Sequence, residues 1–128
     1  MVTIRNWLTL RRVLNAIVAG AAAVLVWWLL AYPRGMMVAW FDQARGRDAI
    51  KSYGLPPPWY RDYFELVTQR YGVSIDRVAD CEISFDTEWY AAGYNSVSGP
   101  RIRRRFGKDI FVECNFNARA AWQQKQGK

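Results

Sequence analysis

The chain of 128 residues contains no histidine, and this absence excludes several kinds of chemistry. A Ser-His-Asp or Cys-His nucleophile needs imidazole as its base, and an HExxH zinc site needs two imidazole ligands. The two cysteines, Cys81 and Cys114, are too few for a zinc site made of thiolates alone. The phosphate-binding patterns GxxxxGK[ST] and GxGxxG are also missing. We therefore expect no cofactor, no metal site and no enzyme of these classes.

Charged residues are missing from positions 13–32, where only Asn15 interrupts an apolar run. At about 1.5 Å per residue, a helix of this length covers roughly 30 Å, the thickness of a bilayer's hydrocarbon core. A cleaved secretory signal has a shorter apolar region, of about 7 to 15 residues, and a small-x-small cleavage site, which residues 28–33 lack. The run therefore predicts a retained signal-anchor, with a transmembrane helix at 13–32 after a short segment at 1–12.

Positive charge on the two sides of this run indicates its orientation. Arg11 and Arg12 lie directly before it, whereas Arg45 and Arg47 follow at a distance and have aspartates close by. Because lysine and arginine near a membrane edge favour the cytoplasmic side, we expect segment 1–12 in the cytoplasm. The rest of the chain would then be a periplasmic, extracytoplasmic domain of a single-pass inner-membrane protein. The inverted topology, with a cytoplasmic domain and reduced cysteines, is the alternative.

Small side chains recur at helical spacing inside the apolar run, at Ala16, Ala19, Gly20 and Ala23. Such a stripe lets a second transmembrane helix approach closely, so we expect a protein partner or a second copy to pack there. The run has no full GxxxG pair, however, and small residues are common in membrane helices in general.

The rest of the chain predicts one small domain. Only 3 of the 18 Lys and Arg residues precede position 34 and all 11 acidic residues follow it, so this part carries a net charge of +4. Its length supports one modest core. We expect a helix-dominated α+β fold of three to five short helices with a two-stranded hairpin. Residues 33–56 are predicted to be a juxtamembrane or interfacial segment, 57–122 the domain and 123–128 a flexible tail.

Periodicity and breakers predict the elements within this part. Residues 39–52 have helical character, and apolar spacing with Gly72 at the end predicts a helix over 58–71. Alternation predicts short strands near 73–75 and 81–85. A helix capped by Asp86 and another beginning near Pro100 follow in the sequence. Residues 109–117 fit both helical spacing and strand alternation, and we predict a helix.

The two cysteines offer a cross-link if the domain is in an oxidising compartment. A Cys81–Cys114 disulfide would close a loop of about 34 residues and stabilise the fold by about 3 to 4 kcal/mol in the chain-entropy model. A strand at 110–116 paired with 81–85 would bring the two residues together. Two buried, reduced thiols are the alternative.

One charge run dominates the domain. Five cations occur within eight residues: Arg101, Arg103, Arg104, Arg105 and Lys108. We interpret this basic patch as a binding surface for an acidic protein or for anionic headgroups. It also fits an amphipathic helix whose arginines face the acidic segment 76–88 of the same fold or of a neighbouring subunit. Nucleic acid is not expected, because only Phe106 offers a stacking ring nearby.

Carboxylates supply the remaining chemical alternative. A glycosidase needs two of them, and Glu65, Asp86 and Glu88 are the first candidates for a membrane-tethered envelope hydrolase. Asp86 is equally explained as a helix cap and Glu65 as a solvated charge, so we assign no catalytic residue. The sequence as a whole favours a single-pass membrane-anchored binding or assembly protein.

Overall fold

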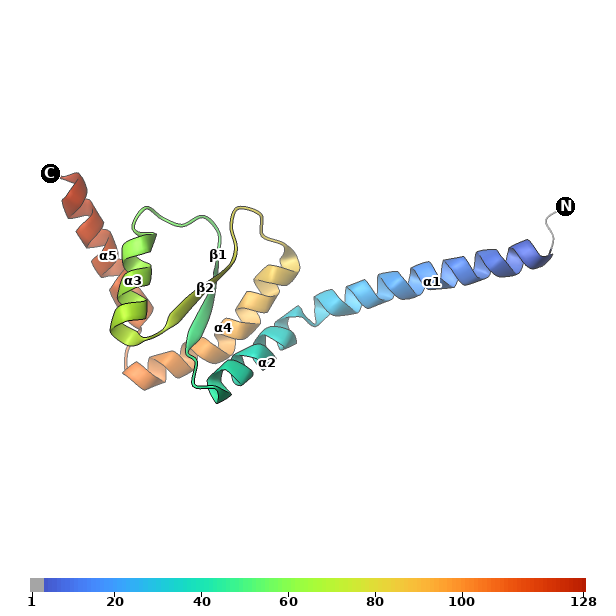
Figure 1. Cartoon of the computed structure of the whole chain (residues 1–128), viewed down its shortest axis with the longest axis horizontal. Helices are drawn as coiled ribbons and strands as arrows, with labels where there is room; N and C mark the ends of the chain where they lie inside the picture. The colour runs from blue at the N-terminus through green and yellow to red at the C-terminus, as the bar shows by residue number, and fades with distance from the viewer. Residues whose placement is uncertain (1–3) are drawn as a thin grey trace. The chain divides into compact units, whose positions relative to one another are not determined.

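The computed structural model describes residues 4–128 and contains five helices and two strands within them (Figure 1). The chain divides after Leu30 into two compact units. The first unit holds α1, and the second, Ala31–Lys128, holds every other element. A helix-dominated α+β architecture is therefore confirmed.

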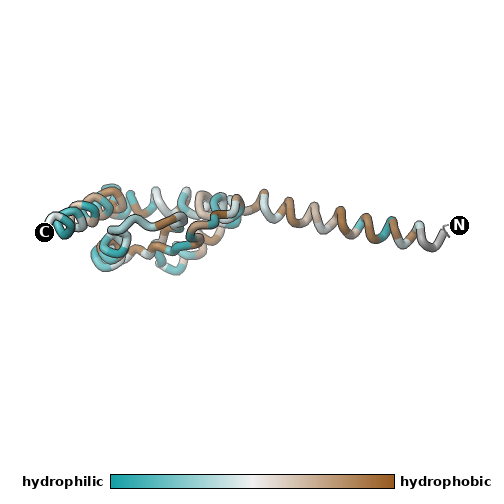
Figure 2. Tube along the Cα trace, turned by 90° about the horizontal axis from the view of Figure 1, so that it is seen from above, coloured by the Kyte–Doolittle hydropathy of each residue, from teal (hydrophilic) through white to brown (hydrophobic). Residues whose placement is uncertain are grey.

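Helix α1 (Ile4–Leu29) is the apolar helix of the first unit. Its segment Trp7–Leu29 is 23 residues long with a mean hydropathy of 1.8, and none of it is buried. Figure 2 shows hydrophobic residues along most of this helix. The segment is thus long and apolar enough to span a membrane. The helix ends at Leu29, earlier than the predicted end at 32, and Pro33 has no N–H with which to continue the hydrogen-bond ladder.

The second unit begins with a close pair of helices, α2 (Ala31–Ala44) and α4 (Phe85–Phe106). They lie side by side in the domain (Figure 1). A Cβ atom on Gly35 would lie 2.1 Å from a backbone oxygen of α4, and one on Gly93 would lie 2.1 Å from a backbone oxygen of α2. Only glycine at these two positions allows the helix backbones to touch.

The sheet consists of two parallel strands, β1 (Ala49–Tyr53) and β2 (Ser74–Ala79), with Ile50 opposite Ile75. Parallel strands need a crossover connection, and α3 (Tyr60–Tyr71) supplies it. The predicted hairpin is therefore wrong.

Two local predictions, the helix over 39–52 and the strand near 81–85, are wrong. Residues 39–52 are not one helix, because α2 ends at Ala44 and Gly46, with φ 74°, turns the chain into β1. Residues 33–56 contain α2 and β1 and belong to the second unit, and their predicted juxtamembrane or interfacial position stays a prediction. Residues 81–84 form no strand, since β2 takes the pairing position beside β1.

The predicted helix over 58–71 is confirmed as α3, and Gly72 ends it in the left-handed region, with its N–H donating to the carbonyl of Thr68. The helical interpretation of 109–117 is also confirmed, because α5 (Ile110–Gln126) begins there. Asp109 caps α5 by accepting the N–H groups of the second and third residues after it, at 3.1 and 3.2 Å. Together with α4 and the sheet, these two helices form the main core, which consists of Val67, Val73, Ile75, Ile102, Ile110 and Cys114.

Helix α4 is one element of 22 residues, where we predicted two helices. Pro100 lies inside it and removes one backbone hydrogen bond. Tyr94, Ser98 and Ile102 are buried at intervals of four on both sides of this proline, so the packing holds the helix together. The predicted cap is also wrong: Ser84 occupies the N-cap position, and its hydroxyl pairs with that of Thr87 at 2.7 Å.

Candidate functional site and interaction surfaces

Four of the five cations of the basic patch pair with carboxylates of the same domain. Arg101 and Arg105 both pair with Asp48, Arg103 pairs with Asp109 at 3.4 Å, and Lys108 pairs with Glu113 at 2.5 Å. Arg104 is exposed and forms no ion pair with any residue that the structure describes. The acids involved lie outside segment 76–88, which we had considered as the internal partner.

Asp48 is the centre of this pairing. Its side chain is only 2% exposed, and it receives Arg101 Nε at 3.4 Å together with the guanidinium of Arg105. The two arginines lie four positions apart on α4, so they reach the same carboxylate from successive turns. A carboxylate this deeply buried requires such compensation, and the pair therefore fixes α4 to the turn before β1.

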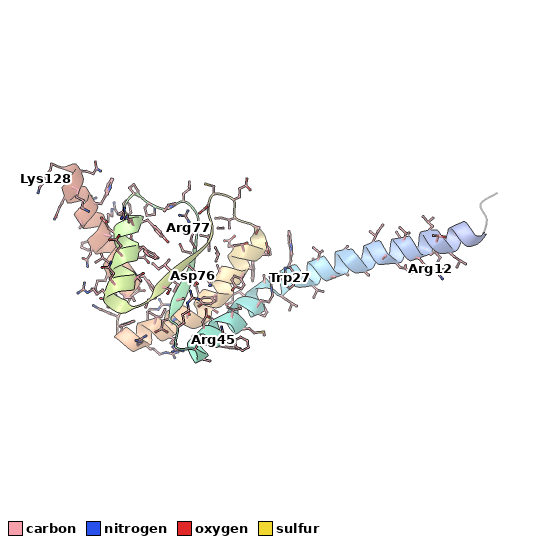
Figure 3. The ribbon with its side chains drawn as sticks, viewed as in Figure 1. Arg12, Trp27, Arg45, Asp76, Arg77 and Lys128 are labelled. Atoms are coloured by element: carbon pink, nitrogen blue, oxygen red, sulfur yellow. The ribbon has the colours of Figure 1, made fainter. Side chains whose placement is uncertain are left out.

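A second cluster of charges joins α2, both strands and α4. The guanidinium of Arg47 contacts both carboxylate oxygens of Asp76, at 2.7 and 2.8 Å, and Asp42 at 3.2 Å. Lys51 Nζ lies 2.7 Å from Asp76, and the buried hydroxyl of Tyr94 donates to Asp42 at 2.6 Å. Figure 3 shows Asp76 on β2 within the domain. The cluster holds elements that are far apart in the sequence.

The titration of this cluster follows from its contacts. Burial acts to raise the pKa of Asp76, but hydrogen bonds and charge from Lys51 and Arg47 outweigh it, and the net pKa is lowered. Burial, followed by the hydrogen bond to Asp42, raises the pKa of the Tyr94 phenol well above its usual value. Asp76 is therefore ionised and Tyr94 neutral throughout the physiological pH range.

Asn95 adds a polar contact between α4 and the sheet. Its side-chain oxygen accepts from the backbone N–H of Lys51 at 2.7 Å, and its side-chain nitrogen donates to the Lys51 carbonyl at 2.8 Å. Both backbone groups of this β1 residue are thus satisfied by one side chain.

The predicted disulfide is wrong, because both cysteines are free. Cys81 is exposed in the loop after β2, whereas Cys114 is buried in the core on α5. Burial raises the pKa of the Cys114 thiol. A strand at 110–116 paired with 81–85 would have brought the two residues together, but this segment is helical.

The candidate carboxylates of the hydrolase alternative line different hollows. Glu65 lies with Asp62 in a groove of about 430 Å³ between α3 and α5, where it also pairs with Arg61 at 3.3 Å. Asp86 lines a separate hollow of about 280 Å³ at the start of α4, and Glu88 lines neither. Within the described residues, no group of three or more acidic or thiol side chains could hold a metal ion.

Three apolar surfaces of the domain are open. On α2, the side chains of Met37, Trp40 and Phe41 are 52%, 55% and 61% exposed and form a shallow hollow with Ala44. We call this the α2 apolar surface. At the start of α4, Ile83, Phe85 and Trp89 are exposed, and on α5 so are Val112 and Phe116.

The α1 stripe of small residues is uncovered in the structure. Ala16, Ala19, Gly20 and Ala23 are exposed, and a Cβ atom on Gly20 would meet nothing within 4 Å.

Comparison with known proteins gives no match: no protein-family model, no curated protein and no solved structure corresponds to this chain. What the protein does is inferred below from its own residues and contacts.

Proposed function

We propose that this protein is a single-pass membrane-anchored binding protein that tethers or stabilises a membrane assembly. The observation that carries the proposal is the segment Trp7–Leu29, whose 23 residues have a mean hydropathy of 1.8 and are entirely unburied. Each Leu, Ile or Val left in water forgoes about 1.5–3 kcal/mol of burial energy, so a lipid environment is the favourable one for this helix. Retention as an anchor, rather than cleavage as a signal, is part of the proposal.

The proposed topology has the N-terminus in the cytoplasm and the domain outside it, in the periplasm of an inner-membrane protein. Arg11 and Arg12, directly before the uncharged run 13–32, support this orientation. Arg47, on the other side, is paired with Asp42 and Asp76, which reduces the net positive charge there.

The proposed mode of action is binding. The domain's largest charge clusters are paired internally, whereas its apolar surfaces and the α1 stripe are open. A partner helix or a second copy would pack on the stripe, and a protein partner would contact Val112 and Phe116. The basic patch contributes less to binding than its sequence suggests, because Arg104 alone among its five cations lacks a carboxylate partner within the described residues.

Alkaline carbonate extraction of vesicles that contain the full-length protein tests the anchor. We expect the protein to remain in the membrane pellet with residues 1–30 still attached, as an intact mass shows. A variant with Val18→Arg and Leu25→Arg should be released, whereas a Val112→Arg, Phe116→Arg control should stay in the pellet. Release of the unaltered chain, or loss of its first 30 residues, contradicts the proposal.

Cys81 gives the topology directly, because it is free and exposed while Cys114 is buried. A membrane-impermeant maleimide should label Cys81 in intact cells whose outer membrane has been permeabilised, and a Cys81→Ser variant should remain unlabelled. Labelling that requires lysis of the inner membrane places the domain in the cytoplasm and contradicts the proposed orientation.

A further inference from the structure

The α2 apolar surface occupies one side of its helix. Met37, Trp40, Phe41 and Ala44 follow intervals of three and four, which places them on a common face. The buried residues Ala31, Gly35 and Ala39, which pack against α4, follow their own interval of four on another face. Helix α2 therefore has one face that the domain covers and one apolar face that it leaves open.

Chain length limits what can cover the open face. Helix α2 begins two residues after the last residue of α1. At about 1.5 Å per helical residue, Met37 and Phe41 lie within roughly 20 Å of Leu29 along the chain. If α1 spans the bilayer, Leu29 marks one edge of its hydrocarbon core, and the α2 apolar surface is within reach of the headgroup layer beyond that edge.

The chemistry of the face suits that layer. Tryptophan is enriched at membrane interfaces, and phenylalanine and methionine supply apolar area for the boundary with the acyl chains. Arg45 follows Phe41 by four positions and is exposed at the C-terminal end of α2 (Figure 3). It forms no ion pair with any residue in the described part of the chain, so its charge is available to a phosphate headgroup.

We infer that the α2 apolar surface lies in the headgroup layer of the bilayer that holds α1, with phospholipid as its occupant. Helix α2 is then an interfacial helix that restricts the domain's orientation on the membrane. This inference rests on the proposed function, since it takes α1 to be embedded.

The test uses the full-length Cys81→Ser chain in phosphatidylcholine–phosphatidylglycerol vesicles. A single added cysteine, Met37→Cys, carries an environment-sensitive NBD label, and the buried Cys114 stays in place. We expect the label's emission to shift to the blue and to fall at least about twofold when lipids with a headgroup-depth spin label are included. The matched control is Phe116→Cys, at a side chain that is 72% exposed on α5, and it should show neither effect.

A second variant removes the proposed contact. Adding Trp40→Glu and Phe41→Glu to the Met37→Cys chain should abolish the quenching while the protein remains in the vesicles. Both side chains are more than half exposed, so these changes should leave the fold intact, as circular dichroism can verify.

The outcomes separate this inference from the anchor. A chain that stays in the vesicles with an unquenched label overturns the inference and leaves the anchor standing, as does equal quenching at positions 37 and 116. In a further outcome, the label's emission is shifted to the blue but spin-labelled lipids do not quench it, and the shift grows with the protein-to-lipid ratio. That result assigns the face to a second copy and also overturns the inference. A chain that fails to enter the vesicles at all contradicts the proposed function itself.

Discussion

Two stripes of small side chains occur within 25 residues of each other, one buried within the domain on α2 and the other exposed on α1. On α2, Ala31, Gly35 and Ala39 are fully or almost fully buried against α4. On α1, Ala16, Ala19, Gly20 and Ala23 are exposed. The difference lies in the partner: α4 presents Gly93, which matches the close approach at Gly35. Small side chains at helical spacing therefore predict a contact with another helix, but they do not identify that helix.

The largest effect should come from filling the covered stripe. Gly35→Leu would place a Cβ atom 2.1 Å from a backbone oxygen, so the helices must separate, and we expect a loss of at least about 4 kcal/mol of unfolding free energy. Denaturation in detergent, followed by near-ultraviolet circular dichroism, measures this loss. Gly20→Leu is the matched control and should leave the domain's stability unchanged, and equal effects of the two changes would contradict the contrast.

The next effect tests whether α4 is also held by charge. Asp48→Asn keeps the shape of the side chain but leaves Arg101 and Arg105 facing a neutral amide, and we expect a loss of about 3 kcal/mol. Asp80→Asn changes a carboxylate that is 77% exposed and should cost less than about 0.5 kcal/mol. Chemical denaturation compares the two, and similar small losses would show that the Asp48 pairing is not required.

A smaller effect should follow from Tyr94→Phe. The change removes the hydroxyl that donates to the nearly buried Asp42, which costs about 1–2 kcal/mol. Tyr53→Phe, at an exposed ring, is the control. Unfolding midpoints in the same denaturant give both values, and a neutral Tyr94→Phe change would mean that water replaces the hydroxyl at Asp42.

The pH dependence should be weaker still. The folded pKa of Asp76 lies below its unfolded value of 3.8, so its stabilising contribution is fully present above that value and is lost as the pH falls through the lower folded pKa. We expect acidification below about pH 4 to lower the unfolding free energy through this group, by less than the loss from Tyr94→Phe. Asp76→Asn should flatten that part of the stability profile, and an unchanged profile would assign the loss to other carboxylates.

The smallest effect concerns the uncovered stripe. Gly20→Leu should weaken self-association or partner binding in the membrane by about 1 kcal/mol or less, whereas Val18→Leu, on the opposite side of α1, should not. Energy transfer between labelled copies in vesicles, or co-purification with a partner, measures the difference. Equal behaviour of the two variants would remove the stripe from the binding surface.

The sequence predicted the helices whose apolar spacing and end residues are regular. Helix α3 has regular apolar spacing and Gly72 at its end, and α5 has an aspartate cap and an alanine-rich continuation, so both are recognisable in the sequence. Strand β1 is not recognisable, because its five residues range from buried to exposed without alternation. They acquire a strand conformation by pairing with β2, which follows α3 in the sequence.

The candidate surfaces also depend on contacts between residues that are far apart in the sequence, which no local pattern predicts. The basic patch is obvious in the sequence, but Asp48 lies 57 positions before Arg105, and no local pattern connects them. Pro100 indicated a helix boundary that packing at Ser98 and Ile102 overrides. Exposure of the α2 apolar surface depended on which face α4 covers, and this also required the three-dimensional fold.

The two hydrogen bonds between the Asn95 side chain and the Lys51 backbone affect whether a strand from another copy can pair with β1. A two-stranded sheet has two open margins, each able to recruit a strand from another chain. At the middle of β1, one side-chain amide already takes both main-chain groups that such a strand would need. A strand from a second copy therefore cannot pair with the middle of β1 at this edge, and copies of the protein can meet there without polymerising through β1.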